Sequence, residues 1–185
     1  MQDFGFCHLS VIPLRNEPSD MSEMTSQLLF GDVFEILESK DNWLYIKNAF
    51  DDYQGWIDIK QQLLISAEEF QQFQKLEYSN KAAGSVIVNE ELIPILAASS
   101  FCSTKTFSIG NYTFKISAEL HKCSSIPFTE ISEIAIDFLN APYLWGGKTA
   151  FGIDCSGFTQ SVYKIAGIKL KRDAREQAKQ GKVLS

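Results

Sequence analysis

The sequence contains no long apolar run. No stretch of its 185 residues approaches the roughly 20 consecutive apolar residues that a membrane-spanning helix needs. The opening MQDFGFCHLSVIPLR also lacks a basic segment followed by an apolar one, which is the pattern of a secretory signal. We therefore expect no membrane partner, and a cytoplasmic location if Met1 is the true start.

Cysteine is scarce and scattered. The cysteines form no Cys-x-x-Cys pair, which argues against a zinc site and against a disulfide framework. Free thiols fit a reducing compartment, and we expect no metal and no cofactor. The four cysteines are Cys7, Cys102, Cys123 and Cys155.

Charge is distributed unevenly around a formal net value of −6. Residues 1–65 hold eleven acidic and four basic residues, whereas residues 164–185 hold seven basic and two acidic ones. An acidic chain is a poor match for a polyanion, so we expect no nucleic-acid partner. The basic stretch is interpreted as the solvated face of a helix.

Short β-strands are predicted in the first 65 residues. The segments VFEIL (33–37), WLYIK (43–47) and GWIDI (55–59) are rich in β-branched and aromatic residues. The polar turns ESKDN and DDYQG separate them. Strands this short and this close together indicate a small barrel over residues 1–65.

A helix is predicted after this barrel. Ser66 and Glu69 have the spacing of a capping box, and Phe70, Phe73 and Tyr78 fit one helical face. More strands are then expected, and we place a second small barrel over residues 66–125.

The strands of this second barrel are predicted at 85–88, 92–96 and 106–117. In the last of these, Gly110-Asn111 lies between two alternating runs, which indicates a two-residue hairpin turn.

From residue 126 the apolar pattern becomes helical. Residues 131–139 repeat at helical spacing, and Pro142 is expected to end that helix. A glycine-bearing loop then leads to Cys155, and a second helix is expected to follow it and to be capped at Gly167. We treat 126–185 as a third unit.

The chemistry of the chain is expected at Cys155. A thiol at the start of a helix meets unpaired backbone N–H groups and the positive end of the helix dipole, which favour the nucleophilic thiolate. Asp154 fits a helix N-cap, and the Cys155 N–H could hold an oxyanion. Acyl transfer also needs an imidazole. Both histidines, His8 and His121, precede Cys155 and are predicted to be structural, although spacing alone leaves His121 open.

The segment PYLWGGKTAFGIDCSGFTQSVYKIAGIKLKRDAREQA resembles the cysteine region of the NlpC-type cell-wall peptidases, a papain-like family. Its Tyr-x-Trp-Gly-Gly, Asp-Cys-Ser-Gly and Arg-Asp-Ala elements stand in the family's order. The segment VIPLRNEPSDMSEMTSQLLFGDVFEIL, with DDYQGWI, is similar to the bacterial SH3-like barrel that precedes such domains. The subgroup with two such barrels is that of the γ-D-glutamyl-L-diamino acid endopeptidases.

This resemblance implies an α+β multidomain fold. Two small SH3-like β-barrels would precede the N-terminal, helical, cysteine-bearing part of a papain-like peptidase domain. The implied substrate is a murein-derived peptide, L-Ala-γ-D-Glu-diamino acid. Which diamino acid is accepted, and the oligomeric state, stay open.

The resemblance also implies residue roles. Cys155 would be the catalytic nucleophile. An acidic residue and a tyrosine of the first barrel would bind the free amine of L-Ala; Tyr53 and Glu23 are the candidates, with Glu17 as the substitute for Glu23. The γ-D-glutamyl site would be lined by Tyr143, Asp154, Ser156, Arg172 and Asp173. Asp173 could also form a reciprocal helix cap with Glu176.

The sequence departs from the family in one respect. The family's catalytic histidine and its polar partner follow the cysteine, and no histidine follows Cys155 here. Residues 126–185 therefore resemble the first part of a catalytic domain, and we expect little or no peptidase activity from this chain as given. The alternative is a non-catalytic module that binds peptides or cell-wall fragments. We also expect Phe158 and Val162 to be exposed and to promote aggregation or pairing.

Overall fold

The computed structural model describes residues 3–103 and 106–182. The first unit is a single antiparallel sheet of strong curvature, with strand order β3-β2-β6-β5-β4-β1-β7. The predicted strands at 33–37, 43–47 and 55–59 are confirmed as its β4, β5 and β6. Its strands are β1 (Asp3–Phe6), β2 (Val11–Arg15), β3 (Met24–Leu29), β4 (Val33–Lys40), β5 (Trp43–Asn48), β6 (Gln54–Asp58) and β7 (Leu63–Ile65).

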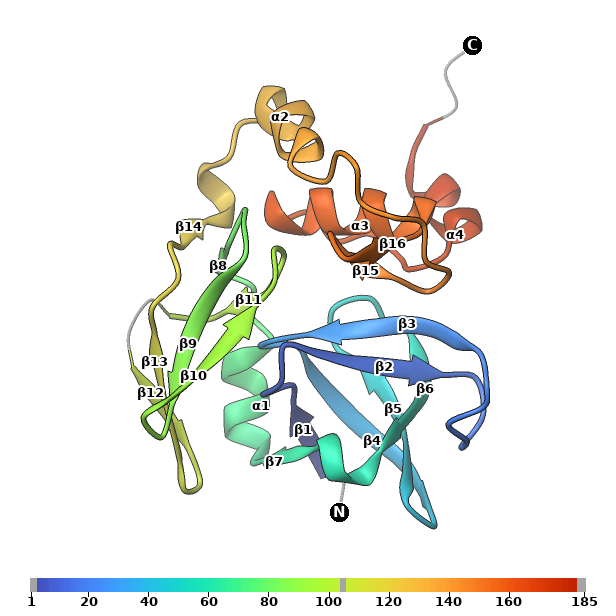
Figure 1. The fold of residues 1–185 in the computed structure, drawn as a ribbon, viewed down its shortest axis with the longest axis vertical. Coiled ribbons are helices and arrows are strands. Elements are labelled where there is room, and N and C mark those ends of the chain that lie inside the picture. Colours follow the sequence, from blue (N-terminus) through green and yellow to red (C-terminus); the bar gives the residue numbers. More distant parts are fainter. Residues whose placement is uncertain (1–2, 104–105, 183–185) are drawn as a thin grey trace.

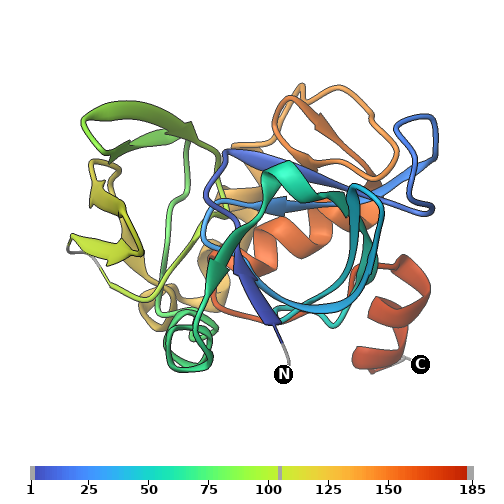
Figure 2. The ribbon, with the colours of Figure 1, turned by 90° about the horizontal axis from the view of Figure 1, so that it is seen from below.

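The interior of this unit is filled by alternate residues of its strands. On β5 the pattern is strict, with Leu44 and Ile46 buried between half-buried neighbours. They pack with Ile12, Leu28 and Ile57. Figure 2 shows the strands curling around this core. This alternation gives the curved sheet one apolar face, which it buries on its inner side.

The predicted capping box is confirmed at the helix α1 (Ala67–Phe73). The Glu69 N–H donates to Ser66 Oγ at 3.2 Å, and the Ser66 N–H donates to Glu69 Oε2 at 2.7 Å. Phe70 and Phe73 are buried, but the placement of Tyr78 on the same helix is wrong. The helix ends at Phe73, and Tyr78 belongs to a strand.

A second β unit follows α1, in two small sheets of strand order β10-β9-β13-β12 and β11-β8-β14. The predicted hairpin is confirmed, since Ile109 pairs with Tyr112 around Gly110, whose φ is +53°. Its strands are β8 (Tyr78–Ser79), β9 (Gly84–Val88), β10 (Glu91–Ile95), β11 (Ser100–Phe101), β12 (Phe107–Ile109), β13 (Tyr112–Ile116) and β14 (His121–Lys122).

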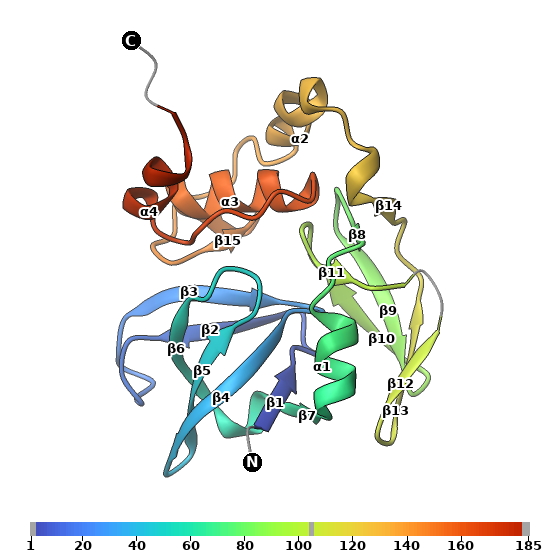
Figure 3. The same cartoon turned by 180° about the vertical axis from the view of Figure 1, so that it is seen from behind.

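The two β units share one aromatic core. Phe6 of β1 lies 5.3 Å from Phe73 of α1 and 5.8 Å from Phe114 of β13, measured between ring centroids. Phe30 lies 5.7 Å from Phe101 of β11. The helix α1 therefore lies between the units and contributes to a common interior (Figure 3).

The C-terminal segment is mostly helical. It lies across the β2–β3 side of the first unit, with α3 above β3 (Figure 1). Its elements are α2 (Ile131–Ile136), β15 (Lys148–Thr149), β16 (Gly152–Ile153), α3 (Cys155–Ile165) and α4 (Ala174–Gln180), and short 3-10 helices occupy Ile59–Gln61, Cys123–Ser125 and Phe128–Glu130. None of the helices in the described residues is long and apolar enough to cross a membrane.

Two expectations for this segment need correction. The helix α2 ends at Ile136, well before Pro142, and a turn follows in which Asn140 has φ +66°. The expected exposure of Val162 is also wrong: it is 3% exposed, because α2 lies against α3. Phe158 is half-buried in the same contact. Exposed apolar side chains at and around α2 include Phe128, Ile136 and Leu139.

Candidate active site

Cys155 is the first residue of α3, and its side chain lies at the surface. Asp154 is the N-cap, as expected, and its Oδ1 accepts the Gly157 N–H at 2.7 Å. A Cβ at Gly157 would lie 2.1 Å from the Gly147 carbonyl oxygen. The first turn of α3 thus packs directly on the Trp-Gly-Gly loop, which requires glycine at this contact.

The residue before Cys155 belongs to a buried ion pair. Arg172 donates to Asp154 through Nη2 at 2.6 Å and through Nη1 at 3.1 Å. Nη1 also donates to Ser156 Oγ at 2.8 Å, and the Ser156 hydroxyl donates to Asp154 at 3.1 Å. Burial acts to raise the pKa of Asp154, but the hydrogen bonds from Arg172 and Gly157 outweigh it and lower that pKa.

The same arginine joins the C-terminal segment to the first β unit. Its Nε donates to Ser26 Oγ of β3 at 3.1 Å. Thr25, the neighbour of Ser26, is hydrogen-bonded to the Tyr53 hydroxyl. Burial raises the pKa of Tyr53, the Thr25 hydrogen bond opposes this, and the charge of Asp173 raises the pKa further. The charges of Arg172 and Asp173 both act on Tyr53, so the three residues lie in one neighbourhood.

Glu23 reaches the site through the Trp-Gly-Gly loop. The Trp145 indole N–H donates to Glu23 Oε1 at 2.5 Å. The loop itself lies against β3, where Gly146, at φ +78°, comes so near that a Cβ would be 2.3 Å from the Met24 carbonyl oxygen. Glu17 is exposed in the preceding loop, with its backbone carbonyl bound by the Ser22 hydroxyl.

Two further predicted residues are exposed near this loop. Tyr143 is 68% exposed and is held by a parallel bridge to Ile153. Asp173 precedes α4, but the reciprocal cap with Glu176 is not formed, and that expectation is wrong. The Glu176 N–H bonds to the backbone carbonyl of Asp173 instead, at 2.9 Å, so the Asp173 side chain makes no capping contact.

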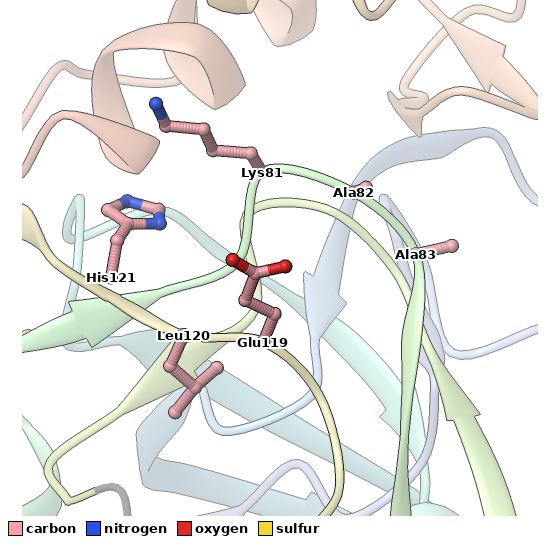
Figure 4. A pocket seen from close by; sticks show the side chains of 6 residues that line it. All are labelled: Lys81, Ala82, Ala83, Glu119, Leu120 and His121. Carbon is pink, nitrogen blue, oxygen red and sulfur yellow. The ribbon is translucent and has the colours of Figure 1, made fainter.

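The histidines lie elsewhere. His121 Nε2 is 3.0 Å from the carbonyl oxygen of Ile165, the last residue of α3. The rise of an α-helix places that end roughly 15 Å from Cys155. His121 lines a different cavity, of about 310 Å³, with Lys81 and Glu119 (Figure 4). His8 lies beside the Tyr112 ring of β13, at 5.9 Å between centroids. Within the described residues, neither histidine serves Cys155.

Models of known families match two stretches of the chain. Residues 14–61 match the bacterial dipeptidyl-peptidase SH3 domain. Residues 140–184, which hold the Trp-Gly-Gly loop, Cys155 and Arg172, match the NlpC/P60 family. This segment is therefore similar in sequence to the NlpC/P60 family.

Individual relatives agree. The chain is 23% identical to dipeptidyl-peptidase 6 of Lysinibacillus sphaericus over 193 residues, covering 86% of this chain and 68% of that protein. It is 51% identical to the γ-D-glutamyl-L-lysine dipeptidyl-peptidase of Bacillus subtilis over 53 residues, which cover 29% of this chain and only 18% of that protein. Its fold resembles a crystal structure of an NlpC/P60 family protein from Bacillus cereus, with a TM-score of 0.75 and 18% identity over 98% of this chain and 78% of that one.

Sequence reasoning missed a set of buried charges between the NlpC/P60 segment and the SH3 domain. Lys164 of α3 and Asp32 form an ion pair of 2.5 Å with side chains 0% and 1% exposed. Burial acts to raise the pKa of Asp32, but Lys164 and Lys148 lower it overall. The solvated-face interpretation of residues 164–185 is therefore wrong for Lys164 and Arg172. The signal was present, because an acidic first unit and a basic last segment are complementary.

Among these buried charges of the described residues, Lys148 lacks a side-chain hydrogen-bond partner. It is 0% exposed, and its Nζ has no hydrogen-bond partner within the described part of the chain. Burial and the nearby charge of Lys164 lower its pKa to about 8, against the opposing attraction of Asp51 and Asp32. A buried, unpartnered ammonium is costly, so this interface carries strain that the other pairs must offset.

Proposed function

We propose that this chain carries the nucleophile and the substrate cleft of a cysteine peptidase. Its substrate would be a murein peptide with a free N-terminal L-Ala, cleaved between γ-D-Glu and the diamino acid. The observation that carries the proposal is the exposed Cys155 thiol at the start of α3, next in sequence to Asp154 of the buried Asp154–Arg172 pair. The named activity of the Bacillus subtilis relative supports the choice of bond.

The chemistry would proceed through an acyl-enzyme. Cys155 Sγ attacks the γ-carbonyl carbon of D-Glu, and the oxyanion that forms can be held by the Cys155 N–H, which has no partner within the helix. The C–N bond then breaks, and the diamino acid leaves as an amine that takes up a proton. Water hydrolyses the thioester and releases L-Ala-γ-D-Glu. Deprotonation of the thiol and of the attacking water needs a general base, and protonation of the leaving amine needs a general acid; neither His8 nor His121 is placed to serve in either role.

The burial of the predicted residues suggests two groups with different roles. Asp154, Ser156 and Arg172 are buried and bonded to one another, so we assign them to holding the first turn of α3 and the SH3 domain in place. The exposed or half-buried residues would contact substrate. They are Tyr143, Asp173, Tyr53 and Glu23.

Glu23 would recognise the substrate amine. One of its oxygens, Oε1, accepts the Trp145 N–H, which leaves Oε2 for a ligand. An N-terminal ammonium would supply the donor and the charge that this carboxylate lacks, whereas an acylated substrate would bring neither. Glu17, which lies in the same loop, is the alternative.

We also propose three units with boundaries at 1–65, 66–125 and 126–185. The four-stranded sheet β10-β9-β13-β12, packed with β11-β8-β14, supports a second SH3-like barrel. The aromatic core that it shares with the first unit makes the pair a single platform for the NlpC/P60 segment. A cytoplasmic site of action would suit a substrate that is already trimmed to a free L-Ala.

Binding to the Cys155→Ala variant tests the proposal without requiring turnover. We expect L-Ala-γ-D-Glu-L-Lys to bind in calorimetry, and we expect its N-acetyl form to bind at least about tenfold more weakly, which corresponds to the loss of one charged hydrogen bond. Glu23→Gln should abolish the difference between the two peptides. Equal affinities in the parent variant would contradict the assignment of Glu23, and no binding of either peptide would contradict the substrate class.

The second candidate is a binding module without catalysis. The distance of His121 from Cys155 favours it for residues 1–185. Release of L-Ala-γ-D-Glu by this chain, lost in Cys155→Ala, would exclude it. Peptide binding without release would support it for this stretch of chain.

A further inference from the structure

The turn that carries Tyr53 is organised by the carboxylate of Asp51, which is 4% exposed. Asp51 Oδ1 accepts the Tyr53 N–H at 3.0 Å and the Asn48 Nδ2 at 3.0 Å. Asn48 ends β5, and Tyr53 precedes β6. A single oxygen thus contacts both sides of the turn and holds the backbone that carries the Tyr53 side chain.

The other oxygen of Asp51 contacts the nucleophile helix. Gln160 Nε2 donates to Asp51 Oδ2 at 2.9 Å, and the same Nε2 donates to the Leu170 carbonyl oxygen at 2.9 Å. Gln160 is 0% exposed and lies on α3 between about one and two turns from Cys155. The carboxylate therefore joins the Tyr53 turn to the helix that begins with the thiol.

The far side of the turn is held as well. Lys171 Nζ donates to the Asp51 carbonyl oxygen at 2.9 Å and to Asp52 Oδ2 at 2.6 Å. Asp52 has φ +62°, a backbone conformation that non-glycine residues seldom adopt. Lys171 immediately precedes Arg172 in the sequence. The same short segment therefore contacts both the Tyr53 turn, through Lys171, and Asp154, through Arg172.

We propose that Asp51 is a positioning residue, which holds the turn that carries Tyr53 against α3 and so fixes where the Tyr53 side chain lies relative to the helix that begins with Cys155. The inference rests on the proposed function only in assuming that Tyr53 contacts the substrate. The placement of Tyr53 follows from the three side-chain and backbone N–H donors that meet on this one carboxylate.

A carboxylate is required because every neighbour on it donates. In Asp51→Asn, one carboxylate oxygen is replaced by an NH₂ group, which is a donor. It would face either the Tyr53 and Asn48 donors or the Gln160 donor, and no hydrogen bond could form there. Gln160 cannot turn its amide over without losing its bond to the Leu170 carbonyl oxygen. Asp51→Asn, which keeps the shape of the side chain, should therefore displace the turn. If Asp51 only filled space, the turn would stay in place.

The test is fluorine NMR of the full chain labelled with 3-fluorotyrosine. The resonance of Tyr53, one of six tyrosines, is assigned by its absence in Tyr53→Phe. We expect Asp51→Asn to shift or broaden that resonance. The matched control is Asp58→Asn, because Asp58 also caps a turn of the SH3 domain, accepting the Lys60 N–H at 2.9 Å at the opposite end of β6. It should leave the Tyr53 resonance unchanged.

Ligand binding gives the functional readout. We expect the affinity for L-Ala-γ-D-Glu to fall about tenfold in Asp51→Asn and to remain unchanged in Asp58→Asn. If Asp51→Asn fails to fold, Gln160→Met leaves the Asp51 carboxylate in place, removes the α3 donor to it together with the bond to the Leu170 carbonyl oxygen, and replaces the residue at similar volume. A Tyr53 resonance that is unchanged in the folded variants would overturn the positioning role.

The two proposals fail differently. A dipeptide that does not move the Tyr53 resonance of the unmodified chain counts against the proposed function. The placement of Tyr53 by Asp51 is still decided by the ligand-free spectra of the variants.

Discussion

The guanidinium of Arg172 donates two hydrogen bonds to the carboxylate of Asp154, at 2.6 and 3.1 Å, and Asp154 is the residue before Cys155. The same guanidinium reaches Ser26 of the SH3 domain at 3.1 Å. The position of the nucleophile and the docking of the SH3 domain therefore depend on one buried side chain.

Replacing Arg172 should destabilise the fold strongly. Arg172→Met leaves the Asp154 carboxylate buried without its partner, and we expect the free energy of unfolding to fall by about 3–5 kcal/mol. Urea denaturation measures this. Arg175→Met, an exposed arginine of α4, is the control and should change stability by less than about 0.5 kcal/mol. Similar losses in both variants would refute the importance of the pair.

Lys148 should make stability depend on pH in the alkaline range. Its pKa of about 8 in the folded chain lies below the value of about 10.4 for an unfolded lysine, so the unfolded state binds more protons between these limits. Burial of the charged amine lowers the free energy of unfolding by about 3 kcal/mol below about pH 8. This loss shrinks as the pH rises and disappears above the unfolded pKa of about 10.4. Lys148→Met should therefore be more stable than the parent at neutral pH, and the difference should shrink through this window. A difference independent of pH would show that the pKa of Lys148 is not lowered in the folded chain.

Asp32 should contribute to acid sensitivity. Its pKa is lowered in the folded chain, so its stabilising effect is present above the unfolded value of about 3.9 and is lost as the pH falls through the folded value. We expect the unfolding free energy of the parent to drop in acid, and to drop less in Asp32→Asn/Lys164→Met. Thermal unfolding across this pH range measures it, and parallel curves for the two proteins would contradict the prediction.

His121 should be irrelevant to the thiol. Its ring bonds to the Ile165 carbonyl oxygen at the far end of α3, so His121→Gln should leave the rate of Cys155 alkylation by iodoacetamide unchanged. Mass spectrometry of the Cys155 peptide measures the rate. If alkylation of Cys155 were markedly slower in a folded His121→Gln variant, His121 would again be a candidate base.

Much of the site could be predicted from local sequence. The N-cap at Asp154, the exposed thiol of Cys155 and the hairpin at Gly110 follow from patterns that span only a few residues, where backbone geometry decides the outcome. The cap at Asp173 failed although its spacing was right. Lys171 and Arg172, which precede Asp173, are held by contacts with Asp51, Asp52, Ser26 and Asp154, which local spacing does not reveal.

The buried charges could not be predicted, because they depend on contacts across more than a hundred residues. Lys164 and Asp32 are 132 positions apart, and Gln160 and Asp51 are 109 apart. Alone, each residue reads as an ordinary surface side chain. Only the opposite charges of the two ends of the sequence indicated that these surfaces meet.

An affinity label tests the central claim most directly. The chloromethyl ketone of L-Ala-γ-D-Glu, with the ketone in place of the scissile carbonyl, forms a thioether when a thiolate displaces its chloride. We predict that it modifies Cys155 alone, and at least about tenfold faster than its N-acetyl analogue when both rates are normalised to iodoacetamide. Equal rates for the two labels, or modification of Cys7, Cys102 or Cys123 instead, would contradict the account.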